Sequence, residues 1–446
     1  MAYWQEHSLG VAPQVSGFGT ANNTDGDYKY LQADKPKVQF ATEQTELDLM
    51  TGQIGAAPER LIGRRHGTIS FAIPLEGLVS GYDPTASNPG DTNVLPHWIC
   101  IAANALGSYI GNVDTAAKFW KGLHLSNSEY TAAGVASATS TAITLDNGAA
   151  SDKVSVGELV ATAFSATSAN VQFGFAKTKA GQVVTLYEAS GNTVNSNAAN
   201  VYGTGTAWIS AAHGNQMPLT MRYVGENTEA CYVLTDAVCT GFKLTWDSGA
   251  VPTAEFTFNF YDYTVDKTKG GLQVPTAFAR VPQIVGAVNG RATIGGSVKC
   301  GLESCTVDYK CEVAELKCHS ATQGIAGVTY KKPRITIGCS IPWVSTDAVY
   351  DAAGGAGNTG SHLWQSYLER GVSSSLGVYV GSNIGRLFAF LVPNAKIVAV
   401  PQIADLSGAV GYQLTIEAGA YTADSTDTAE TSTNSPLDSL FRLALG

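Results

Sequence analysis

The sequence predicts a mainly β protein with a few helices, and three observations lead to this fold class. The 446 residues are 44% hydrophobic and only 14% charged, with 48 glycines. Many short stretches alternate apolar and polar residues and end at glycine, proline or asparagine, which is typical of half-buried strands joined by turns. The pattern Tyr-Val-Gly-x-Asn occurs at Tyr223 and again at Tyr379. We therefore expect a β-rich chain that contains an internal duplication.

The repeat extends downstream of this pattern. Residues 236–264 match residues 394–422 at an offset of 158 or 159 positions. Ser-Gly-Ala-Val occurs in both segments, at Ser248 and at Ser407, between alternating apolar stretches. A hairpin turn absorbs a slip of one residue, so both segments are predicted to fold as the same antiparallel pair.

The repeat also extends upstream. GTISFAIP at 67–74 matches ITIGCSIP at 335–342, at an offset of 268, and each alternates like a strand that ends at a proline. TELDL from Thr45 is matched to CTVDY from Cys305, at an offset of 260. This alignment predicts that the loop between the two strands is about eight residues longer in the second copy.

Each copy is also predicted to contain one amphipathic helix, at Leu95–Gly107 and at Ser361–Gly371, each with start and stop signals. The helices match at an offset near 265, whereas the Tyr-Val-Gly strands match at 156, so about 109 extra residues lie between them in the first copy. This segment, about 108–216, contains the strand patterns AITLD, DKVSVGELVATAF, NVQFGFAK and GQVVTLYEA, and it predicts a small separate β domain. The predicted organisation is an N-terminal arm at 1–37, a first β-sandwich domain at 38–264 with the insertion, a connector at 265–296, a second domain at 297–422 and a C-terminal arm at 423–446.

Composition and motifs argue against several functions. The net charge is −10 and no run of Lys or Arg exceeds two residues, so tight nucleic-acid binding is disfavoured. The first residues lack the basic and apolar segments of a signal peptide, and no apolar run approaches the roughly 18 residues of a membrane span. Walker A, G-x-S-x-G and H-E-x-x-H motifs are absent from the sequence. We therefore expect a protein made in the cytosol that is not an enzyme and takes no cofactor.

The eight cysteines include no C-x-x-C spacing. A metal site is one interpretation, and buried free thiols in a reducing compartment are the favoured one. The metal interpretation would use Cys300, Cys305, Cys311, Cys318 and His319. The equivalent residues His97 and His362, and Trp98 and Trp364 beside them, favour a packing or capping role over catalysis or sugar stacking.

The order of elements resembles the tail tube proteins, or major tail proteins, of long-tailed bacteriophages, in the type with a duplicated domain. The resemblance covers about three quarters of the chain. It rests on the strand, loop and strand at 45–77, the helix at Leu95–Gly107, ACYVLTDAVCTGFKLTW from Ala230, LFAFLVPNAKIVAV from Leu387, and the C-terminal SPLDSLFRLALG.

The resemblance implies a structural virion protein. In that family each domain gives strands to a closed β-barrel around a lumen, and six domains complete a ring, so a two-domain chain would form a trimeric, pseudo-hexameric ring. Stacked rings would form the tail tube, the conduit for genome ejection. The implied partners are further copies of the chain, the tape measure protein, tail tip and terminator proteins, and viral DNA that passes without specific binding. The implied location is the virion tail, assembled in the host cytoplasm.

The family's long loop contacts the neighbouring ring, and here it maps to about Thr51–Arg65 and His319–Lys332. The expected contact residues are Gln53, Arg60, Arg64, Arg65, Gln323, Lys331 and Lys332. The inserted domain would project outward and is a candidate for binding host surface glycans. A trimer would carry a charge near −30, three times −10, which fits a lumen that repels DNA. The alternatives are another tail ring, such as a terminator or baseplate protein, and a β-rich glycan-binding surface protein; a tail-associated hydrolase is disfavoured for want of a catalytic site.

Overall fold

The structure is a computed structural model, and strands account for most of the residues that it describes, which confirms the mainly β fold class. Within these residues no helix is long and apolar enough to cross a bilayer. The described residues are 7–14, 16–31, 33–47, 59–79, 101–102, 105–110, 135–139, 142–145, 157, 159–163, 172–187, 200–203, 205–209, 218–225, 231–247, 250–269, 282–284, 291–294, 297–299, 303–319, 321, 324–342, 373–380, 388–399, 402–406, 409–419 and 440–445.

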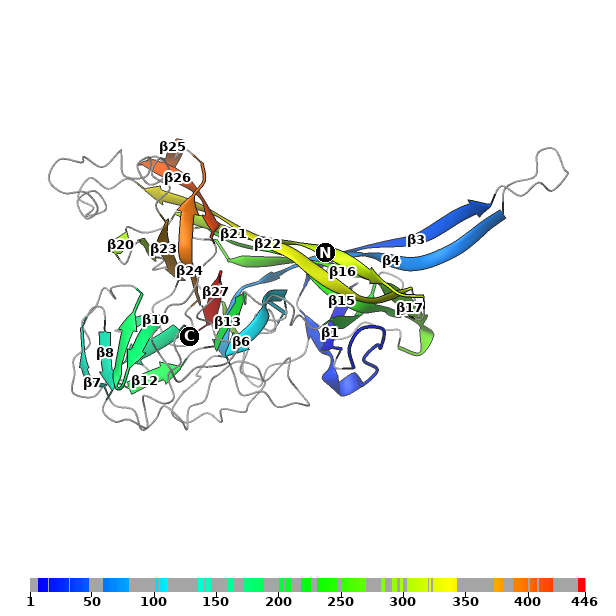
Figure 1. The fold of residues 1–446 in the computed structure, drawn as a ribbon, viewed down its shortest axis with the longest axis horizontal. Helices are drawn as coiled ribbons and strands as arrows, with labels where there is room; N and C mark the ends of the chain where they lie inside the picture. The colour runs from blue at the N-terminus through cyan, green and yellow to red at the C-terminus, as the bar shows by residue number, and fades with distance from the viewer. Residues whose placement is uncertain are drawn as a thin grey trace, which may run out of the picture.

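One antiparallel sheet runs through both repeats and along the length of the molecule (Figure 1). Its strands pair in the order β3–β4–β16–β15–β21–β22–β26–β25, so the pairing of β15 with β21 joins the first repeat to the second. The bounds are Asp34–Leu47 for β3, Glu59–Pro74 for β4, Cys231–Asp247 for β15, Thr253–Phe260 for β16, Ser304–Lys317 for β21, Ile325–Pro342 for β22, Gln402–Leu406 for β25 and Ala409–Ala418 for β26.

The two Tyr-Val-Gly patterns lie on equivalent strands, β14 (Leu219–Val224) and β23 (Ser373–Val380). Met221 on β14 is opposite Leu234 on β15. Gly377, the residue 156 positions after Met221, is opposite Leu391 on β24 (Phe388–Ile397). Leu391 lies 157 positions after Leu234, between the offsets of 156 and 158 that the sequence match predicts on either side, so the two copies share this strand pairing and their registers agree to within one residue. The shared pairing supports the duplication predicted from the sequence.

The upstream alignment of the two copies was wrong in its register. Val38 on β3 is opposite Ile69 on β4, and Val307 on β21 is opposite Ile337 on β22. Ile69 and Ile337 differ by the predicted 268, but Val38 and Val307 differ by 269 rather than 260. Strand β3 thus begins earlier than the TELDL motif suggested, and the two hairpins have nearly equal lengths.

The segments predicted as an arm and a connector both contribute strands. Strand β1 (Ser8–Pro13) pairs with β14, and β2 (Lys29–Leu31) pairs with β1. In the second copy, β19 (Arg291–Ile294) pairs with β23, and β20 (Ser297–Lys299) pairs with β19. Each repeat therefore starts with the same two-strand extension of its sheet, and within the predicted N-terminal arm β1 and β2 belong to that sheet.

The end of the predicted C-terminal arm is also a strand. Strand β27 (Arg442–Leu445) pairs with β24 and with β13 (Gly205–Ile209), which pairs in turn with β6 (Gly107–Ile110). Both β6 and β13 therefore belong to the larger sheet, although β13 and most of β6 fall within the predicted insertion at 108–216. The strands of the inserted sheet lie within residues 135–203, a shorter segment than the predicted insertion at 108–216.

The inserted segment forms a separate six-stranded sheet in the order β12–β9–β10–β11–β8–β7, and one of its strands overlaps each of the four predicted patterns. Phe175 and Tyr187 pack against Tyr379 and Leu391 of the second repeat. The bounds are Val135–Ala138 for β7, Ala142–Leu145 for β8, Leu159–Ala163 for β9, Gln172–Ala180 for β10, Val183–Leu186 for β11 and Asn200–Gly203 for β12. The remaining described elements are β5 (Glu76–Val79), β17 (Asp262–Asp266), β18 (Pro282–Ile284) and the 3-10 turns η2 (Asp25–Asp27) and η3 (Lys267–Lys269).

The core lies along one face of the large sheet, because the central strands alternate apolar and polar residues. On β16, Phe256 and Phe258 are fully buried, whereas Glu255, the residue before Phe256, is exposed to solvent. Each buried phenylalanine removes enough apolar surface from water to stabilise the fold by about 2–3 kcal/mol. Four residues of the first predicted helix, Ile101, Ala102, Ala105 and Leu106, are helical and buried in this core, whereas Ser361–Gly371 lies outside the described residues.

Candidate assembly surfaces

Two long hairpins hold most of the basic residues that we expected to contact a neighbouring ring. Strands β3 and β4 extend beyond the rest of the sheet (Figure 1). Arg60, Arg64 and Arg65 lie on β4, and Lys331 and Lys332 lie on β22, so all five are on strands and not in loops. The predicted loops are correspondingly shorter. Gln53 and Gln323 lie outside the described residues.

Arg64 is engaged within the chain. Its guanidinium lies 2.9 Å from the Glu43 carboxylate on β3 and 2.8 Å from Glu315 on β21, and only 13% of its side chain is exposed. The hydrogen bond with Glu315 raises the pKa of Arg64 above its usual range, so the charge is permanent. Arg64 therefore ties the first hairpin to the second.

The other basic residues are more accessible. Arg65 lies 3.5 Å from Asp262 and 5.4 Å from the centre of the Tyr263 ring, and 43% of its side chain is exposed. Lys331 and Lys332 are exposed, and Lys332 has a φ of 37° beside a bulge in the hairpin. A contact of Arg65, Lys331 and Lys332 with a neighbouring ring stays a prediction. Among the described interactions, neither lysine contacts Arg64.

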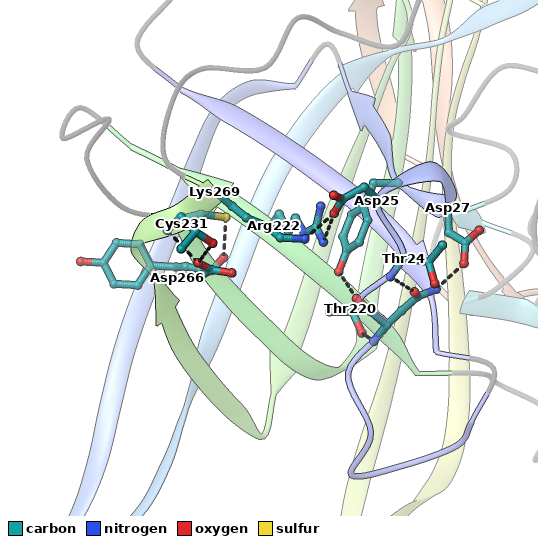
Figure 2. Close-up of polar contacts among 12 residues, drawn as sticks. Thr24, Asp25, Asp27, Thr220, Arg222, Cys231, Asp266 and Lys269 are labelled. Atoms are coloured by element: carbon teal, nitrogen blue, oxygen red, sulfur yellow. Dashed lines mark hydrogen bonds and ion pairs between the residues drawn. The ribbon is translucent and has the colours of Figure 1, made fainter.

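A polar cluster fixes the N-terminal segment to β14 (Figure 2). Arg222 on β14 donates to Asp25 over 2.7 Å and stacks 3.7 Å above the Tyr28 ring, while Lys269 also pairs with Asp25. The hydrogen bonds from Lys269 and then Arg222 lower the pKa of Asp25. Burial raises the pKa of Tyr28 well above its usual value, so its ring is neutral beneath the guanidinium. These contacts fix Asp25 and Tyr28 of the N-terminal segment to Arg222 on β14, which is a structural role.

A second polar cluster surrounds Asp236 on β15. Its carboxylate accepts hydrogen bonds from the Gly19 backbone N–H over 2.7 Å and from the Gln14 amide, and Gln14 in turn accepts from the Asp236 backbone N–H over 3.1 Å. Burial raises the pKa of Asp236. Its φ is 57°, a left-handed value that few residues other than Gly, Asn and Asp adopt readily. Asn394 is its equivalent in the second repeat.

The face of the large sheet opposite the core is polar and mixed in charge. One row crosses the sheet as Glu255, Lys243, Asp308, Thr336 and Glu417, residues that lie opposite one another on successive strands. Acidic and basic side chains thus alternate in the first half of the row. A neighbouring row consists of Thr253, Thr245, Thr306, Gly338 and Thr415. The acidic balance of the whole chain is therefore not concentrated along these two rows.

The order of eight strands from β3 to β25 within the large sheet has an edge strand at each end. Among the described residues, β3 pairs only with β4 and β25 pairs only with β26. Two of the exposed large apolar side chains lie on these edges: Phe40 on β3 is 40% exposed and Ile403 on β25 is 68% exposed. Edge strands with exposed apolar residues are templates for pairing with another chain.

Six of the eight cysteines lie in the described residues, and no two of these six form a disulfide with each other. Cys305 on β21 and Cys339 on β22 lie opposite each other in the core with their sulfurs 3.3 Å apart. Burial raises the pKa of Cys305 well above its usual value. Within the described part of the chain no three His, Cys, Asp or Glu side chains are placed to hold a metal ion, and Cys300 lies outside it.

Sequence reasoning missed the two edges, because an exposed edge is a property of strand order and not of any motif. It also missed the Asp25, Arg222 and Lys269 cluster, whose members are separated by almost two hundred and fifty positions at the widest. No protein-family model matches the chain, and no curated protein has significant similarity to it.

Proposed function

We propose that the protein is a structural subunit that assembles through its sheet edges into closed rings, and that the rings stack into a tail tube. The observation that carries this proposal is the pairing of β15 with β21, which joins two copies of one unit into a continuous sheet. One repeat has thus already docked on the other by strand pairing. The same unit repeated in further chains would continue the sheet until it closes.

A closed ring would remove the two edges at β3 and β25. Each chain contributes eight strands to the order from β3 to β25, so three chains would supply 24. Barrels of 16 to 18 strands already leave an aqueous channel, and a wider barrel would leave an open lumen. Closure abolishes the exposed edges that would otherwise promote irregular aggregation.

The polar face suits the lumen of such a ring. Rows of threonines and of alternating charges offer no basic stripe for phosphates to bind. DNA and a tape measure protein could then pass without adhering. The inserted sheet, packed on the far side of β23 and β24 through residues such as Phe175, would remain outside the lumen as a candidate site for surface glycans.

Electron microscopy of the purified chain tests the proposal. Hollow tubes built of threefold rings support it. Single rings that do not stack favour the alternative of a terminator or baseplate ring, and monomers at high concentration contradict ring assembly altogether. A β-rich glycan-binding surface protein would be monomeric and would bind a glycan array.

A further inference from the structure

The two repeats allow the contact between neighbouring subunits to be specified residue by residue. Strand β3 is the counterpart of β21, because Val38 and Val307 lie opposite the equivalent residues Ile69 and Ile337. The edge of β21 that pairs with β15 therefore corresponds to the edge of β3 that has no partner strand among the described residues.

Strand β25 is likewise the counterpart of the central part of β15. Leu244 on β15 lies opposite Ala254 on β16. Ile403 on β25 lies opposite Tyr412 on β26. Tyr412 is the equivalent of Ala254, 158 positions later in the chain. Ile403 thus occupies the place of Leu244, and the edge of β25 corresponds to the edge of β15 that receives β21.

The junction inside the chain consequently shows which residues meet. At that junction Leu244 lies opposite Val307, and both are fully buried. We infer that β25 of one subunit pairs antiparallel with β3 of the next subunit, in the register that places Ile403 opposite Val38. This inference rests on the proposed ring assembly and defines its interface.

The exposed apolar residues agree with this register. Tyr309 on β21 is fully buried at the internal junction, where its ring stacks 5.0 Å from that of Phe242. Its counterpart on β3 is Phe40, which is 40% exposed at the open edge. Ile403 is 68% exposed, whereas its counterpart Leu244 is fully buried. Both edge residues are exposed because the strand that would cover them belongs to another copy.

The register also defines the polar side of the interface. At the internal junction Lys243 lies opposite Asp308. The equivalent positions at the edges are Gln402 and Gln39, and both side chains are exposed. Paired amides would replace the paired charges there, so the junction between subunits would depend less on ionic strength than a charged one.

Disulfide trapping tests the register. The double variant V38C/I403C is assembled and then treated with a copper phenanthroline catalyst in air, so that two thiols lose two protons and two electrons to dioxygen and form one disulfide. We expect covalent dimers and then trimers as the largest product. The control variant V38C/Q402C is shifted by one residue, which turns one thiol to the opposite face of the sheet, and should give only the background of the unmodified chain.

The outcomes separate this inference from the proposed function. Rings seen by microscopy without the V38C/I403C product, or with the shifted product instead, overturn the register and leave ring assembly standing. Absence of rings for the unmodified chain overturns both.

A substitution without cysteine provides a second test. Ile403→Asp should abolish ring formation, measured as molar mass by light scattering, while the melting temperature of the monomer stays unchanged because the side chain is exposed. Val183→Asp, at a 39% exposed position of the inserted sheet, is the matched control and should assemble normally. Assembly of the Ile403→Asp variant at the level of the unmodified chain would overturn the inference.

Discussion

Arg64 on β4 and Glu315 on β21 form an ion pair of 2.8 Å that joins the two long hairpins of the chain. Glu43 on β3 accepts a second contact from the same guanidinium at 2.9 Å. The residue that the sequence offered as a contact to a neighbouring ring is thus used inside the subunit. The hairpins are therefore held as a pair before any assembly takes place.

Replacing Arg64 by leucine should lower the free energy of unfolding by about 1–3 kcal/mol, because Glu315 would lose its partner in a poorly solvated position. Urea denaturation measures this change. Arg64→Lys is the matched control: it keeps the charge but cannot serve two carboxylates in the same fork geometry, so an intermediate loss is expected. An unchanged denaturation midpoint for Arg64→Leu would contradict the role of the ion pair.

Asp236→Asn should make the protein more stable than the unmodified chain above about pH 4, by a margin that grows with pH, because an amide replaces a buried carboxyl whose ionisation is unfavourable in the folded state. Burial raises the pKa of Asp236, so the native state binds its proton more tightly than the unfolded state, and stability is lost as pH rises from the ordinary pKa of an aspartate through the higher pKa of the native state. An asparagine keeps the acceptor oxygen and tolerates the left-handed φ.

Thermal unfolding from pH 3 to pH 7 tests this prediction. The two proteins should have similar stability at pH 3, where the aspartate is protonated in both states, and should diverge at higher pH. Asp236→Ala is the control, because it removes the acceptor for Gly19 and should destabilise the protein at every pH by about 1–3 kcal/mol. Parallel curves for Asp236→Asn and the unmodified chain would refute the proposed cost of the buried carboxylate.

Cys305 and Cys339 should resist diamide in the native protein, because both are buried and burial raises the pKa of Cys305. Oxidation with diamide during refolding from urea should join them, because the fold brings their sulfurs within 3.3 Å on adjacent strands. The product would lack two hydrogens by intact mass and would yield one linked peptide pair. Closing the loop of 34 positions between the two residues should stabilise the fold by up to about 4 kcal/mol in the chain-entropy view. Cys339→Val should remove both effects, and linkage to a different cysteine would contradict the prediction.

Phe175→Ala should loosen the inserted sheet from the second repeat. Phe175 is fully buried, and its ring centre lies 6.1 Å from that of Tyr379. Loss of a buried phenylalanine costs about 3–5 kcal/mol, so limited proteolysis should cleave the variant faster within 135–203 than elsewhere. Val183→Ala changes an exposed residue of the same sheet and should cleave like the unmodified chain.

The sequence revealed the duplication and the inserted sheet because both leave local patterns: paired motifs at constant offsets, and alternating strands between turns. It misplaced β3, because strands of period two match one another at several registers and TELDL alternates as well as KVQF does. It missed β1 for the opposite reason. All six residues of Ser8–Pro13 are buried, so this strand has no polar face to reveal it.

Cryo-electron microscopy of the purified chain, at a resolution that separates strands, tests the proposed ring assembly most directly. We expect hollow tubes of threefold rings, in which β25 of each subunit pairs with β3 of the next and Ile403 lies opposite Val38. Particles in which both edges remain open at high protein concentration would contradict it.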